Sequence, residues 1–159
     1  MRPDGSQSRL NGAGAHYPDI AAPIVAGVAL RRRAERAVAG WLGAFNAHDL
    51  DGMLSWMDPE VDFRPLRMAG AEPCYEGHDG VRRWFAAQAL SGDGHRLDAS
   101  ELRDTGEGWV IVIGALELPE EPTLVHVCAT YRVHEGLIVA ARHYFSELDV
   151  PDRVGAGLE

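Results

Sequence analysis

The chain has 159 residues, enough for one domain with its own core, and 46% of them are hydrophobic. Its 24 acidic and 15 basic side chains give a formal net charge of −9. This charge argues against a nucleic acid or an anionic membrane as a partner, because phosphate binding needs a basic face. Cys74 and Cys128 have neither zinc-ligand spacing nor the pattern of a disulfide framework. We therefore expect a cytoplasmic protein with no metal ion and no other cofactor.

The first part of the chain predicts an unstructured leader and then a long helix. Residues 1–23 are rich in Gly, Ser, Asn, Pro and Ala and show no periodicity, so we expect a disordered leader. The domain is expected to span residues 24–148, and residues 149–159 to form a tail. Between residues 24 and 47, apolar side chains recur at three- and four-residue steps, which predicts an amphipathic helix. The apolar stripe consists of Val38, Trp41, Leu42 and Phe45.

A polar turn separates this helix from the next two elements. Asp49 is positioned to cap a short helix over residues 50–57, because an aspartate side chain accepts hydrogen bonds from the first-turn N–H groups. Pro59 is expected to end that helix, since proline lacks a backbone N–H group. The alternation of apolar and polar side chains over residues 61–64 predicts a strand.

The remaining chain predicts a third helix and then a meander of strands. Asp79 is positioned to cap a helix over residues 80–90, and the Ser-Gly-Asp-Gly sequence at 91–94 ends it. Four strand-like segments separated by turn residues follow. They cover residues 96–102, 109–118, 124–133 and 137–148. Helices followed by an antiparallel sheet make an α+β architecture.

Three stretches in the first half of the chain resemble a known family. They read AFNAHDLDGML at 44–54, DPEVDFRP at 58–65 and YEGHDGVRRWF at 75–85. In this order they resemble the nuclear transport factor two-like superfamily, which includes SnoaL-like polyketide cyclases, ketosteroid isomerases and limonene epoxide hydrolases. The resemblance covers residues 34–148. It implies a cone-shaped, curved antiparallel sheet wrapped around N-terminal helices, one deep pocket, and assembly into a homodimer.

The third predicted strand has one apolar face and one mixed face, because side chains alternate across a strand. The apolar set should face the core and the pocket. It consists of Val125, Val127, Ala129, Tyr131 and Val133. The resemblance implies that the opposite face packs against a second subunit. That face carries His126, Cys128, Thr130 and Arg132.

The stretch RHYFSE at 142–147 resembles the last strand of ketosteroid isomerases and limonene epoxide hydrolases. By this match His143 and Phe145 face the pocket, and His143 falls where an epoxide hydrolase has its catalytic acid. An inward histidine in an otherwise apolar cone is unusual. Two interpretations stay open: a functional residue, or a core histidine whose ring binds a backbone carbonyl.

In the first strand, Asp62 and Arg64 share a face. The resemblance puts Arg64 at the position of the isomerase base, a role that an always-protonated guanidinium cannot fill. Arg64 therefore either binds an anionic ligand group or pairs with Asp62 or Glu60. The isomerase tyrosine and carboxylic acid positions are Trp41 and Ala129, so ketosteroid isomerisation by that mechanism is not expected.

Two hypotheses for the function follow. The first is a SnoaL-like cyclase, isomerase, dehydratase or hydrolase acting on a hydrophobic, oxygenated small molecule. His143 would be its acid–base residue, Asp62 would orient His143, and Arg64 would bind an anionic group. The apolar wall would consist of Trp41, Phe45, Phe85, Tyr131 and Phe145. The second hypothesis is a non-catalytic ligand-binding or protein-interaction module of the same fold, which the missing catalytic sets favour.

Overall fold

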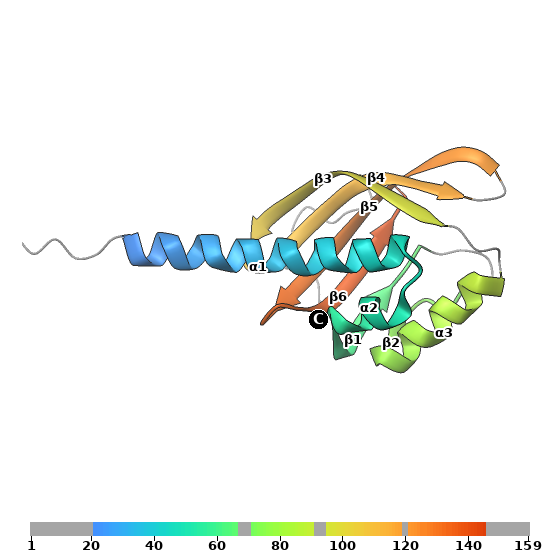
Figure 1. Cartoon of the computed structure of the whole chain (residues 1–159), viewed down its shortest axis with the longest axis horizontal. Coiled ribbons are helices and arrows are strands. Elements are labelled where there is room, and N and C mark those ends of the chain that lie inside the picture. The colour runs from blue at the N-terminus through green and yellow to red at the C-terminus, as the bar shows by residue number, and fades with distance from the viewer. Residues whose placement is uncertain (1–20, 67–70, 91–94, 119–120, 146–159) are drawn as a thin grey trace, which may run out of the picture.

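The computed structural model describes residues 21–66, 71–90, 95–118 and 121–145, which form one curved six-stranded sheet and three helices (Figure 1). The helices are α1 (Ala21–Asn46), α2 (Leu50–Ser55) and α3 (Gly77–Leu90). The strands are β1 (Met57–Arg64), β2 (Tyr75–Glu76), β3 (Arg96–Gly106), β4 (Trp109–Leu118), β5 (Glu121–His134) and β6 (Leu137–Tyr144). The predicted tail and nearly all of the predicted leader lie outside the described residues. No helix in the described part of the chain has both the length and the apolar character needed to cross a membrane.

The helix starts confirm one predicted cap and correct another. Asp49 caps α2, and its side chain accepts a hydrogen bond of 3.0 Å from the backbone N–H of Gly52. Asp79 is not a cap, because α3 begins two residues earlier, at Gly77. It lies in the first turn of α3, where a negative charge is favourable, and pairs with Arg82 at 2.8 Å.

The sequence had predicted that Pro59 ends α2, and this is wrong: Pro59 lies within β1. The short helix ends at Ser55, and β1 begins at Met57. Pairing between β1 and β6 shifts register between Met57 and Asp62, so no regular ladder bond is required of the proline in this interval. A bulged strand therefore accommodates a residue that a regular central strand would exclude.

The sheet has the strand order β2-β1-β6-β5-β4-β3, and all its neighbours are antiparallel except β1 and β6. The sequence had predicted the strand at 61–64 and the antiparallel meander, but not the parallel pairing of β1 with β6. It had also missed β2, whose two residues are too short for a periodic pattern. β3 is longer than predicted and pairs with β4 up to Gly106. β5 and β6 form the predicted hairpin, with positive φ at Glu135 and Gly136.

Helix α1 lies along the sheet (Figure 1), and its apolar stripe packs into the core between them. Ala34, Ala37, Val38 and Trp41 are buried at helical spacing and belong to one core with the inward side chains of the strands. Each fully buried large apolar side chain contributes roughly 1.5–3 kcal/mol to folding. Packing of this stripe, more than helix propensity, therefore holds α1 in place.

The last residue of α1 also ties the helix to the start of β3. The Asn46 amide donates a hydrogen bond of 2.9 Å to the Leu97 carbonyl and accepts one of 2.8 Å from the Leu97 N–H. This pair of bonds imitates the pairing of two strands and satisfies both polar groups of a buried backbone unit. It fixes the position of the β3 segment that borders the cavity described below.

Candidate functional site

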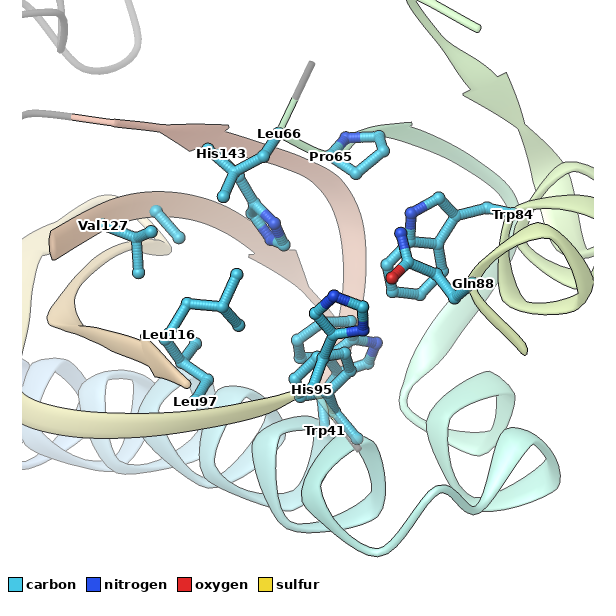
Figure 2. A pocket seen from close by; sticks show the side chains of 12 residues that line it. Trp41, Pro65, Leu66, Trp84, Gln88, His95, Leu97, Leu116, Val127 and His143 are labelled. Carbon is cyan, nitrogen blue, oxygen red and sulfur yellow. The ribbon is translucent and has the colours of Figure 1, made fainter. Parts of the chain in front are cut away.

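A small cavity lies between α1, α3 and the inward face of the sheet (Figure 2). The space open to the centres of water-sized molecules is about 50 Å³, room for a few waters or for one ring of a larger ligand. Its apolar lining consists of Trp41, Phe45, Pro65, Leu66, Trp84, Leu97, Leu116, Val127 and Ala129. Its polar lining consists of Gln88, His95 and His143. An apolar cavity with a few polar groups is typical of a small-molecule site.

Aromatic rings from two helices form one wall of the cavity. Trp41 stacks on Phe45 with 5.5 Å between ring centroids, and Phe45 stacks on Trp84 at 6.1 Å. The indole Nε1 of Trp41 donates to the sulfur of Met57 at 3.2 Å, and Met57 is not among the cavity lining. The wall therefore offers flat apolar surface to a ligand rather than hydrogen bonds.

His143 supplies a polar group in the aromatic surroundings. Its Nε2 lies 3.1 Å from the hydroxyl oxygen of Tyr131, which is completely buried. Phe63 meets the imidazole edge-on at 5.5 Å, and Trp41 does so at 6.0 Å. The residue as a whole is only half-buried because it opens onto the cavity (Figure 2).

Both members of this pair are neutral at pH 7. Burial lowers the pKa of His143 to about 4, because the charged imidazolium would lose its hydration there. Burial likewise raises the pKa of Tyr131 well above its ordinary value. The pair can therefore exchange hydrogen bonds with a ligand at neutral pH, but it carries no charge there.

The register of two strands brings the pair together. Ala129 of β5 lies opposite His143 of β6, and Tyr131 lies opposite Ala141. Tyr131 and His143 are therefore diagonal neighbours on the inward face, within reach of an aromatic side chain. The small Ala141 leaves space across the strand pair for the tyrosine ring.

Asp62 does not orient His143, so that predicted pairing is wrong. Its carboxylate accepts hydrogen bonds from Arg64 Nε at 2.9 Å and from Cys74 Sγ at 3.1 Å. Burial would raise the pKa of Asp62, but the bonds from Arg64 and Cys74 outweigh burial and hold it below its ordinary value. Phe63 is buried in the core, so the strand pleat directs both of its neighbours to the other face.

Arg64 pairs with Asp62 in a two-pronged ion pair outside the cavity, at 2.9 and 3.2 Å. The sequence left open whether Arg64 binds an anionic ligand group or pairs with a neighbouring carboxylate, and the structure shows the pair with Asp62. Hydrogen bonding to Asp62 raises the pKa of Arg64 further above its already high value. The guanidinium does not line the cavity and does not contact its polar groups.

The predicted apolar wall is partly rearranged. Trp41 and Phe45 line the cavity, and Tyr131 lies behind His143. Phe85 packs against the core but does not line the cavity, because its neighbour Trp84 occupies the inward position on α3. Phe145 is half exposed and lies past the end of β6, where strand alternation no longer directs it inward.

Sequence reasoning missed two polar residues of the lining. Gln88 follows the cavity residue Trp84 by four positions on α3, a spacing that places both on one helix face. His95 lies directly before β3, two positions from Leu97, a spacing at which side chains of extended backbone share one face. Burial, then repulsion from His48, lowers the pKa of His95. Within the four described ranges, no three His, Cys, Asp or Glu side chains lie close enough together to bind a metal ion.

Comparisons with known proteins agree on the family and the fold. A sequence model of the SnoaL-like domain matches residues 38–141. TerC, which was co-crystallised with polyporic acid, is 20% identical over 73% of this chain and 93% of its own, with a TM-score of 0.65. Bal32a, from a soil-derived mobile gene cassette, is 16% identical over 75% of this chain and 93% of its own, with a TM-score of 0.66. A putative polyketide cyclase from Sinorhizobium meliloti is 16% identical over 69% of this chain and 94% of its own, with a TM-score of 0.59. At these identities the structures show the fold alone, and no curated protein matches the chain.

Proposed function

The chain belongs to the SnoaL-like domain family, and on this premise we propose that it binds a hydrophobic, oxygenated small molecule in its cavity. The observation that carries the proposal is the imidazole of His143 on an otherwise mainly apolar wall. A buried polar group that contacts a cavity fixes the orientation of a ligand, while the aromatic wall supplies most of the binding energy. Polyporic acid, with which TerC was co-crystallised, is one compound to test.

We propose further that His143 acts on the ligand, in a cyclisation, isomerisation, dehydration or hydrolysis. A neutral imidazole can hydrogen-bond to a carbonyl oxygen and stabilise the negative charge that develops on it. Asp62 has no part in this proposal, since its carboxylate is engaged by Arg64 and Cys74. The non-catalytic alternative uses the same cavity for binding only. Chromatography and NMR of the compound recovered after incubation distinguish the two, because an isomerisation leaves the mass unchanged.

A thermal-shift screen of aromatic polyketides, steroids, terpenoids and polyporic acid tests the proposal. A ligand at about 100 times its dissociation constant should raise the melting temperature by roughly 5–10 °C. Leu116→Phe fills the cavity from its wall and should abolish the shift, and His143→Phe should weaken it. Arg64→Ala, outside the cavity, should leave it intact. The absence of a shift with every compound, or an equal shift in Leu116→Phe, would overturn the proposal.

We also propose that the chain forms a homodimer through the outer face of its sheet. By register, Ile113 of β4, Cys128 of β5 and Tyr144 of β6 form one row across this face, and Ile111 lies beside it. Half-buried isoleucines on a sheet face that no helix of the described residues covers are suited to pack against the same surface of a second copy. Light scattering should find a dimer for the native chain and a monomer for Ile113→Arg. A monomeric native chain would refute the proposal.

A further inference from the structure

The hydrogen bond between Tyr131 and His143 determines which imidazole nitrogen carries the proton. A phenol hydroxyl can donate and accept, whereas a neutral imidazole has one donor and one acceptor nitrogen. Tyr131 is completely buried, and among the described residues its hydroxyl has His143 Nε2 as its only hydrogen-bond partner. A proton on Nε2 would leave the phenol hydrogen buried without an acceptor, which is costly. The phenol therefore donates to Nε2, and the imidazole proton lies on Nδ1.

Nδ1 is the nitrogen left for a ligand. No hydrogen bond joins it to another described residue. It is also not one of the fully buried polar atoms that lack a hydrogen-bond partner, which among the described residues are Asp104 Oδ2 and Arg142 Nε. The other surroundings of the ring are aromatic, with Phe63 and Trp41 both near its edge or face. Since His143 lines the cavity, its N–H donor is accessible to a molecule bound there.

The rest of the lining limits what this donor can bind. Apart from His143, the polar side chains among the described lining residues are Gln88 and His95, and none of the described lining residues is an arginine or lysine. A carboxylate would lose its hydration and gain a neutral donor rather than a cation, so its transfer into the cavity is unfavourable. A hydrocarbon would leave the N–H donor without a partner, and sites built around a hydrogen bond reject such analogues.

We propose that Tyr131 locks His143 as the Nδ1–H tautomer, and that the cavity thereby selects ligands with a neutral carbonyl oxygen, such as aromatic ketones, over carboxylates. Tyr131 is a positioning residue, because it acts through the imidazole and does not contact the ligand. The inference rests on the proposed function for its ligand class. The tautomer itself does not depend on any ligand.

The tautomer is tested on the ligand-free protein by nitrogen NMR with ¹⁵N-labelled histidine. The chain has seven histidines, and the His143 resonances are those that disappear in His143→Phe. At pH 7 we expect Nδ1 to be protonated and Nε2 to be an unprotonated acceptor. In Tyr131→Phe, which keeps the ring and removes the hydroxyl, a mixture of the two tautomers is expected. Protonated Nε2 in the native protein would overturn the proposed lock.

Ligand selection is tested with ethylbenzene, acetophenone and benzoate, three probes that share one ring and differ in the group it bears. Acetophenone should bind roughly five- to tenfold more tightly than ethylbenzene, the effect of one hydrogen bond, and benzoate no more tightly than ethylbenzene. His143→Phe should remove the preference for the ketone, and Tyr131→Phe should reduce it. Equal binding of the first two probes, or tightest binding of benzoate, would overturn the selectivity. Failure of all three to bind would instead refute the cavity as a ligand site, while the NMR result would still decide the tautomer.

Discussion

Lowering the pH from 6.5 to 4 should destabilise the protein through His143. In the unfolded chain this imidazole takes up a proton near its ordinary pKa of 6.5, whereas burial lowers the pKa in the folded protein to about 4. Between these values the unfolded state binds the proton and the folded state does not, so the free energy of unfolding falls as the pH falls. With the pKa lowered from 6.5 to about 4, at about 1.4 kcal/mol per tenfold change in proton affinity, the full effect is about 3.5 kcal/mol, of which about 3 kcal/mol falls between pH 7.5 and 4.

Urea unfolding at several pH values between 4 and 7.5, followed by tryptophan fluorescence, measures this loss. His143→Phe has no titrating group at this position, so its stability should depend less on pH, by about 3 kcal/mol over the same interval. His95, whose pKa is also lowered, contributes with the same sign, and His95→Gln isolates its share. Asp62 falls outside the interval, because its folded pKa lies below its ordinary value of 3.8. Parallel pH curves for the native protein and His143→Phe would refute the reasoning.

Two further predictions concern stability away from the cavity. Gly43→Ala should stabilise the protein by roughly 0.5–1 kcal/mol, because a methyl group there meets no other atom and alanine favours helix. Gly40→Ala should destabilise the protein by roughly 1–3 kcal/mol, because its methyl group would overlap the Trp56 indole. Urea midpoints compare the two variants, and stabilisation by both would contradict the packing of α1. Arg64→Ala should change the free energy of unfolding by less than about 1 kcal/mol, because its ion pair with Asp62 is largely exposed. A larger loss at low and high salt alike would show that the side chain has another role.

The inward set of β5 was predictable because alternation is a local property. Val127, Ala129 and Tyr131 are buried on the core side, as the apolar pattern of the sequence predicted. The same alternation already separated Asp62 from the inward Phe63, so the sequence contained the signal that argued against Asp62 as the partner of His143. The resemblance to catalytic relatives outweighed that signal.

The missed cavity residues have a different explanation. Trp84 and Gln88 share one face of α3, but helical spacing does not tell whether that face meets the core or a cavity. Phe85 was expected in the wall because it is aromatic, although its place on the helix turns it away from the inward position of Trp84. Local patterns rank side chains by their tendency to be buried, whereas a cavity is the space that packed elements leave between them.

Periodicity, turn chemistry and short matching stretches were enough to predict the helices, most strands, the cap at Asp49 and the inward direction of His143. The parallel pairing of β1 with β6 and the partner of His143 could not be predicted from local patterns. These features depend on the register between strands distant in the chain, and register is set by the packing of the whole sheet. The shift of the His143 pKa has the same origin, since burial among rings from three elements lowers it and no single segment encodes that environment.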